Sequence, residues 1–545
     1  MPDNRTPWPF RERWRIEGCL MTEGPLHIGS GGITTHPDLK DGDEPVEIGD
    51  CIRDAEGLPV LPATSLKGAL HAWLEGRAEK AETCLGRVFG LDSVRDNPGC
   101  GGDANFHDAH LCMGRTGQMP LTHWDAKRHS WIEVINSIDR ERGVAAENHL
   151  AHHATVPAGV GFQVVISGRF TKPDQDIPLL LAALEGFNDR CDPVRLGSDT
   201  GSGKGRMRWE LEAIYRMDAA GVAAWVADND RGMAHRSLAV IGPECRAELL
   251  KKARDVVSCK GNPRRRIGIE LRFDGPFLVN DPPTEREKDA PLENRPPNAR
   301  PRTDEMGRVL LPAKSFRGVL RTQAERVLRT MLDLDDDRWL EAELQSEIHR
   351  RVACRPEIPE LACKPVKEPN EVPERLCLAC QLFGAPGWRS PLRISDFTLV
   401  EGDYESITQE MLAVDRFTGG GKHGAKYNAL AIVSPKLTGT IEVEEWRLKR
   451  QPWALGLLAL VLRDLKEGDL AFGWGAAGKG YGRCEADIPI WRDEEFRDEA
   501  NKSWEIFVNA IKVQKKVIEK ARREASKSKG SSAEAKPEAG QSGYE

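Results

Sequence analysis

The sequence predicts an α+β protein built from two tandem copies of one mixed unit, and three observations lead to this prediction. The stretch "LPATSLKGAL" at 61–70 returns as "LPAKSFRGVL" at 311–320. Further matching segments follow in the same order in both halves and end in a glycine-rich loop. Each half alternates helix-like runs with hairpin-like strand pairs, which suits an α+β unit better than a parallel doubly wound sheet. A repeat of this length indicates that the whole fold is built from two copies of one unit.

The repeat also defines the domain organisation. Each copy opens with a strand-like run that ends in a Gly-Pro turn, at 24–25 and at 275–276. An apolar, helix-like run precedes the final loop, at 177–189 and at 453–465. We therefore expect a first unit over 10–215, a connector over 216–263, a second unit over 264–490 and a helical, then disordered, C-terminal part over 491–545.

Composition narrows the class of protein. The chain has 545 residues and no apolar run near the roughly 20 residues that span a bilayer. Its N-terminus lacks the apolar core of a signal peptide, so we expect a cytoplasmic protein without a membrane partner. Thirteen cysteines without an export signal favour free thiols or metal ligands over disulfides. The net charge of −7 does not exclude nucleic-acid binding, because such binding depends on local basic patches such as "NPRRRIG".

The repeated stretch joins a strand to a helix, and a helix N-terminus offers free N–H groups and a positive dipole end to a phosphate. Ser65 and Lys67 of the first copy recur as Ser315 and Arg317. An ordinary helix N-cap is the alternative, because serine and threonine are common at that position. Retention of a cation in both copies favours phosphate binding.

The loops "GSGKGR" (201–206) and "GKGYGR" (478–483) close the two copies. Glycines let a backbone approach closely, cations neutralise phosphates, and a tyrosine ring can stack on a base. A plain β-turn is the alternative interpretation, but the place of both loops at the end of a repeat favours RNA contact. The candidate RNA contacts here are Lys204, Arg206, Lys479, Tyr481 and Arg483.

A metal site is predicted in the second copy. "CLAC" places Cys377 and Cys380 at the two-residue spacing of a zinc knuckle, and Cys354 and Cys363 lie upstream. Structural zinc takes four such ligands in a tetrahedron, so we expect these cysteines to bind it. A set of buried thiols is the alternative.

The order "GPLHIG", "LPATSLKG", "FG", "DA", "GSGKGR", with "LPAKSFRG", "CLACQLFG", "ISDF" and "GKGYGR" in the second copy, resembles the RAMP superfamily. Its members form the backbone of CRISPR effector complexes. The resemblance covers about 15–215 and 265–488, and the tandem arrangement is similar to the fused backbone subunits of type III systems, type III-D in particular. It implies two ferredoxin-like (RRM-like) units with irregular insertions, namely the zinc knuckle and a thumb in each copy, near 137–150 and 413–430.

The function that the resemblance implies is antiviral: binding of CRISPR RNA and, with other subunits of the complex, cleavage of a paired single-stranded target RNA. The endoribonuclease step would use Mg²⁺ or Mn²⁺ and an aspartate between the first strand and first helix. At the position where the family usually has this aspartate, the two copies have Ile48 and Asn298, which are not acids. The candidates are therefore the nearby Asp43, Asp50, Asp281 and Asp289. Two alternatives stay open: a backbone that binds guide RNA without nuclease activity, and an endoribonuclease that processes CRISPR RNA.

Overall fold

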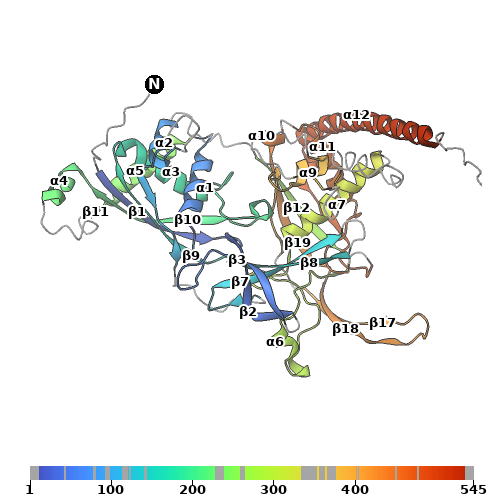
Figure 1. Ribbon diagram of the computed structural model, residues 1–545. Helices are drawn as coiled ribbons and strands as arrows, with labels where there is room; N and C mark the ends of the chain where they lie inside the picture. The colour runs from blue at the N-terminus through green and yellow to red at the C-terminus, as the bar shows by residue number, and fades with distance from the viewer. Residues whose placement is uncertain are drawn as a thin grey trace, which may run out of the picture.

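The computed structural model of the protein describes residues 12–41, 44–75, 77, 82–91, 99–112, 121, 124–139, 144–227, 238–257, 264–332, 353–354, 362–364, 376–400, 402, 404–448, 451–475 and 478–533. The first half of the chain forms one lobe and the second half forms another beside it (Figure 1). None of the helices in these ranges combines the length and the apolarity that crossing a bilayer requires.

The first lobe is built on an antiparallel sheet in the order β11-β10-β1-β9-β4, with β5 also paired to β9. Helix α1 lies between β1 and β4 in sequence, and α3 lies between β9 and β10. The unit therefore runs β1-α1-β4-β9-α3-β10, which is the ferredoxin-like order. The bounds are β1 Glu12–Thr22, α1 Ala63–Leu74, α2 Glu82–Phe89, β4 Ala104–Phe106, β5 His110–Leu111, β9 Gly161–Phe170, α3 Pro173–Glu185, β10 Met207–Met217, α4 Ala219–Ala227, β11 Ala239–Val240 and α5 Pro243–Val256.

The second lobe repeats this plan, with a sheet in the order β14-β16-β19-β12-β20 and β15 paired to β19. Helix α7 follows β12, and α11 lies between β19 and β20. The prediction of an α+β protein with two ferredoxin-like units is confirmed. The bounds are β12 Arg264–Phe273, β14 Leu310–Leu311, α7 Ala313–Leu332, α9 Leu378–Phe383, β15 Leu392–Ile394, β16 Phe397–Leu399, β19 Lys436–Glu444, α10 Glu445–Leu448, α11 Ala454–Lys466, β20 Cys484–Asp487 and α12 Glu494–Ala533.

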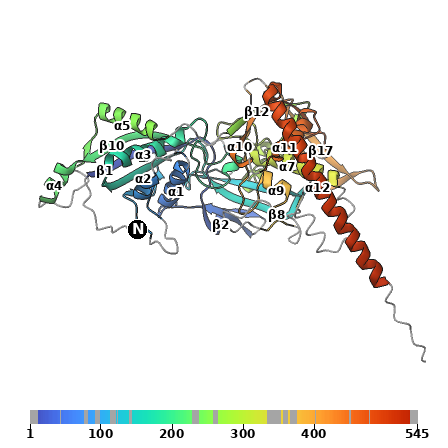
Figure 2. The ribbon, with the colours of Figure 1, turned by 90° about the horizontal axis from the view of Figure 1, so that it is seen from above.

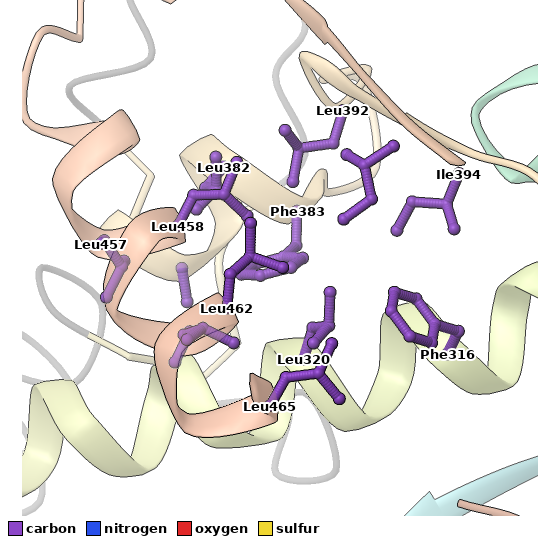
Figure 3. Close-up of a cluster of buried hydrophobic side chains, with 14 of the residues drawn as sticks. Phe316, Leu320, Leu382, Phe383, Leu392, Ile394, Leu457, Leu458, Leu462 and Leu465 are labelled. Carbon is purple, nitrogen blue, oxygen red and sulfur yellow. The ribbon is translucent and has the colours of Figure 1, made fainter. Parts of the chain in front are cut away.

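The core of the second lobe explains the position of its repeated stretch. Phe316 is fully buried, and its ring lies 4.2 Å from that of Phe397 and 5.1 Å from that of Phe472, measured between centroids. Figure 3 shows Phe316 and Leu320 of α7 pointing into the same buried cluster as Leu458 and Leu462 of α11. A buried side chain of this size contributes about 1.5–3 kcal/mol. The first lobe uses Leu66 and Leu70 in the same way, both fully buried.

A smaller sheet is inserted in each lobe and ends in a β-hairpin. The first has the order β2-β3-β8-β7-β6, and the second has the order β13-β18-β17. Hairpins β7–β8 and β17–β18 contain the segments predicted as thumbs, apart from residues 140–143, which lie outside the described residues. Hairpin β17–β18 projects from the second lobe (Figure 1). Helix α12 also extends past the rest of that lobe (Figure 2). The bounds are β2 Gly29–Asp41, β3 Glu44–Cys51, β6 Trp124–Asp125, β7 Ser130–Asp139, β8 Val144–Thr155, β13 Pro276–Phe277, α6 Glu285–Lys288, β17 Ser406–Val414 and β18 Gly421–Val433.

Buried ion pairs join the two lobes. Glu133 on β7 accepts from Lys204 of its own unit and, at 3.1 Å, from Arg302 of the second unit. Asp192 of the first unit pairs with Arg264 of the second, and Glu442 of the second lies 3.7 Å from Arg195 of the first. Buried carboxylates and guanidinium groups are stable only when paired, so these contacts fix how the lobes meet.

Replacing Glu133 by Gln is predicted to destabilise the fold by about 3 kcal/mol, because Lys204 and Arg302 lose their shared carboxylate. Burial alone would raise the pKa of Glu133, but Lys204 and Arg302 outweigh it and lower that pKa from 4.5 to about 2. Its contribution is therefore present above pH 4.5 and is lost as the pH falls towards 2.

Chemical denaturation near neutral pH and at falling pH checks this prediction. As the pH falls, the free energy of unfolding should decrease less in the variant than in the parent, because the variant has no Glu133 to protonate. The matched control is the exposed Glu210→Gln. Equal stability of both variants would contradict the assignment.

Candidate nucleic-acid interface and metal centre

The N-termini of α1 and α7, which the sequence suggested as phosphate sites, are each capped by an acid that lies between two later strands. The Ala63 N–H donates to Asp108 Oδ1 and the Ala313 N–H to Asp396 Oδ1, both at 2.7 Å. Burial raises the pKa of Asp396. Sequence reasoning missed this role, although the matching segments "FHDAHL" and "ISDF" carry both acids. A carboxylate thus already binds the first N–H of each helix.

The cations of this stretch differ between the copies. Lys67 is half-buried and makes no hydrogen bond or ion pair with the described part of the chain. Arg317 donates to the carbonyls of Leu392 (3.0 Å) and Phe383 (3.3 Å) and to that of Gly201 in the other unit. Burial lowers the pKa of Arg317 to about 10. Ser65 is half-buried and Ser315 is exposed.

The closing loops have the same backbone geometry in both units. Gly205 (φ 74°) and Gly482 (φ 70°) donate their N–H groups to the carbonyls of Pro25 (2.8 Å) and Pro276 (2.9 Å). A Cβ at either glycine would overlap the carbonyl of Leu196 or Phe472. The repeated glycines are therefore required where the loop crosses the Gly-Pro turn, independently of any ligand.

The residue before each of these glycines connects the loop to the hairpin of its own unit. Lys204 is buried and paired with Glu133 on β7. Tyr481 is buried, and its hydroxyl donates to Gln409 on β17. Arg206 pairs with Glu23 at 2.8 Å. Among the loop cations of the described residues, Lys479 and Arg483 are exposed.

Lys479 is part of an aromatic platform, our name for Trp474, Tyr427 and Lys479. The Lys479 ammonium lies 3.8 Å from the Trp474 ring centroid and 4.9 Å from that of Tyr427. It also donates to the Tyr427 hydroxyl at 2.6 Å. Trp474 and Tyr427 are partly exposed. Sequence reasoning missed both rings; the tryptophan inside "FGWG" was the available signal.

The tip of hairpin β17–β18 exposes an aromatic side chain. Phe417 is 100% exposed, with Val414 at 60% beside it. Asp415 Oδ1 accepts from the N–H groups of Phe417 and Thr418, both at 2.9 Å, which lowers the pKa of Asp415. The acid thus orders the turn, and the phenylalanine side chain at its tip is fully exposed.

The candidate catalytic acids have different surroundings. Arg53 Nε donates to both Asp50 oxygens (3.0 and 3.1 Å), and the Cys51 N–H donates to one of them. Burial raises the pKa of Asp50, but these donors outweigh it and leave the pKa below its usual value. Asp281 is half-buried and its N–H donates to the Arg300 carbonyl, whereas Asp289 is exposed. Asp43 lies outside the described residues. Within those residues, the groups able to hold a metal ion include none of these acids.

The predicted cysteine set does come together. Cys354, Cys363, Cys377 and Cys380 are all buried, and their Sγ atoms lie within 4.8 Å of one another. Tetrahedral zinc with bonds of about 2.3 Å needs sulfur atoms about 3.8 Å apart, so the cluster fits. The N–H groups of Cys377 and Cys380 donate to Sγ atoms at 3.3 Å, and Arg321 donates to Cys380 Sγ at 3.0 Å. These donors favour thiolates, and four thiolates in one buried site require a cation.

Fold and site together define a tandem ferredoxin-like protein whose second unit has a basic, aromatic surface where its closing loop meets the inserted hairpin. The family model of the RAMP superfamily matches residues 19–208 and 264–485. The chain belongs to this superfamily and contains two tandem RAMP units. Membership supports a CRISPR-associated RNA-binding role, with CRISPR RNA and effector-complex subunits as partners. Comparison with individual curated proteins gives no match.

Replacing Cys377 by Ser is predicted to remove bound metal and to lower the melting temperature. Three thiolates hold the ion less tightly than four, and the start of α9 is then no longer connected through the metal to the other cysteines. Elemental analysis of the purified protein and a thermal melt measure both effects. The exposed Cys191→Ser serves as the control. A metal-free parent protein would contradict the assignment of these cysteines as ligands.

Proposed function

We propose that this protein is a backbone subunit of a type III CRISPR effector complex and binds CRISPR RNA along both RAMP units. The aromatic platform carries the proposal. It combines a cation for a phosphate with aromatic rings for a nucleobase, beside a hairpin whose tip exposes Phe417. This combination is typical of binding to single-stranded nucleic acid. Arg483, exposed in the same loop, adds a second cation.

The platform gives a direct test. Trp474→Ala removes a stacking surface and is expected to weaken binding of single-stranded RNA by about 1–3 kcal/mol, roughly 5- to 150-fold. Lys479→Ala should reduce the slope of log K against log salt by about 0.7, because one phosphate contact is lost. Filter binding over a salt series measures both.

The control variant is Trp446→Ala. This tryptophan is 39% exposed and lies on α10, at the far end of the second lobe from hairpin β17–β18 (Figure 1). It should bind RNA as the parent does. If Trp474→Ala and Trp446→Ala bind alike, the platform is not an RNA contact.

We further propose that the metal held by the cysteine cluster is zinc with a structural role. All four donors are thiolates, which zinc prefers, and their burial leaves no open position for a substrate. The cluster joins the start of α9 to the segments at 353–354 and 362–364. Zinc would therefore stabilise the insertion of the second unit rather than take part in RNA cleavage.

Target cleavage with Mg²⁺ or Mn²⁺ is the second part of the functional hypothesis, and the surroundings of the acids bear on it. Arg53 neutralises Asp50, which favours a structural role for that residue. Asp281 and Asp289 lie after β13 and α6, within the segment between β12 and α7 of the second unit. These two acids, with Asp43, remain the candidates for a metal-dependent cut. A guide-RNA-binding backbone that leaves cleavage to its neighbours is the alternative.

Alanine variants in the assembled complex separate these hypotheses. Asp50→Ala should lower stability by about 3 kcal/mol, since Arg53 loses its carboxylate, and should not remove a single cut selectively. Asp281→Ala or Asp289→Ala should leave guide binding intact and, if the residue is catalytic, abolish one product on a complementary target RNA. Denaturation and gel analysis of the products give the readouts. If every cut persists in all variants, Asp43→Ala included, these acids are not catalytic, and the protein is a backbone that binds guide RNA without cleaving the target.

A further inference from the structure

Three sulfur-bearing side chains meet on the sheet of the first unit, outside the sites described above. We call Cys19, Met21 and Cys112 the sulfur triad. Cys19 and Met21 are two residues apart on β1 and therefore lie on the same face of the sheet. The Cys19 Sγ lies 3.5 Å from the Met21 Sδ and 3.8 Å from the Sγ of Cys112, which directly follows β5. Cys19 and Met21 are buried, and Cys112 is half-buried.

Gly161 on β9 leaves the space in which these sulfur atoms meet. Strand β9 pairs with both β1 and β5, with Gly161 opposite Met21. The Gly161 carbonyl accepts from the Cys112 N–H at 2.8 Å. A Cβ at Gly161 would lie 2.9 Å from the Met21 Sδ and 3.0 Å from the Cys19 Sγ. Any side chain at this strand position would therefore fill the space that the triad shares.

The same arrangement is unsuited to a disulfide between Cys19 and Cys112. The segments that carry them flank β9, so their backbones are two strand spacings apart, about 9.6 Å at about 4.8 Å each. A disulfide needs Cα atoms within about 7 Å of each other. The two thiols therefore face each other across the glycine but cannot join without movement of the backbone.

The charge around the triad favours a cation. Burial raises the pKa of Cys19 to about 12, and the neighbouring Cys112 and Glu212 act in the same direction. Burial also raises the pKa of Cys112, and Glu212 adds to this effect. The Glu212 carboxylate accepts from the amide of Gln163 at 2.9 Å, which leaves its charge in place. A bound cation would be attracted by this carboxylate and would release the two thiol protons.

We propose that the sulfur triad binds one soft monovalent cation, Cu⁺, beside Gly161. Thiolate and thioether sulfur atoms are the ligands that select Cu⁺, whereas structural zinc is held by cysteine, histidine and carboxylate groups. In a trigonal site with metal–sulfur bonds of about 2.3 Å, the sulfur atoms are about 4.0 Å apart. The distances of 3.5 and 3.8 Å in the triad are close to this value. The half-buried Cys112 gives the ion access from solvent.

Titration of Cu⁺ into the full-length protein as purified tests the proposal, with bicinchoninate as a coloured competitor in oxygen-free, reducing buffer. Cys112→Ser and Met21→Leu should each weaken Cu⁺ binding about tenfold or more, because one of three sulfur ligands is lost. Leucine conserves the volume of methionine, so the core is retained. Gly161→Ala should also weaken binding, because its methyl group fills the shared space. The exposed Cys191→Ser should bind as the parent does.

Thermal melts without copper establish that each variant is folded. The cysteine cluster of the second unit is identical in parent and variants, so a difference in Cu⁺ affinity between them belongs to the triad. Elemental analysis of the same samples follows the metal of that cluster. Copper taken up only in exchange for that metal, or equal affinity of the parent and Cys112→Ser, would overturn the proposal. Unchanged binding by Met21→Leu would overturn it as well, and no outcome bears on the RNA-binding proposal, because no RNA is present.

Discussion

The contact of Glu133 with two cations is the interaction on which the arrangement of the molecule depends. This buried carboxylate lies on hairpin β7–β8, and it binds Lys204 from the closing loop of the first unit and Arg302 from the second unit. Three parts of the chain thus meet at one charge. Removing Glu133 would take the shared carboxylate away from both Lys204 and Arg302, which is far more costly than losing a surface ion pair. The hairpins and the inter-unit interface are therefore positioned together.

The features that could be predicted from the sequence are those encoded locally. The two α+β units follow from the repeated segments and from helix-like runs that alternate with strand pairs, and the resemblance to the RAMP superfamily implied their ferredoxin-like form. The cysteine cluster was indicated by a two-residue spacing that one tight turn can satisfy. The roles of Lys204 and Arg317 could not be predicted in this way. Their partners lie 71 and 116 residues away in the chain, so only the folded arrangement reveals that these cations are used internally.

The two units keep one backbone and vary the chemistry placed on it. The position before the last loop glycine is lysine in one unit and tyrosine in the other, yet each side chain binds the hairpin of its own unit. Because the glycines beside them are fixed by the crossing of the Gly-Pro turn, the side chain between can change without moving the loop. Divergence at Trp474 and Lys479, where the first unit has Ser198 and Ser202, produces the aromatic platform of the second unit.

The repeated stretch at 61–70 and 311–320 indicated a phosphate site, and the acids that cap its two helices bear on that interpretation. Asp108 and Asp396 bind the first N–H of each helix, and a carboxylate at this point opposes the approach of a second anion. A backbone carbonyl carries no net charge and meets no such repulsion. At the N-terminus of α7, all the acceptors that Arg317 binds are backbone carbonyls, and one of them belongs to the first unit. Lys67 has no such acceptor among the described residues and stays a predicted RNA contact.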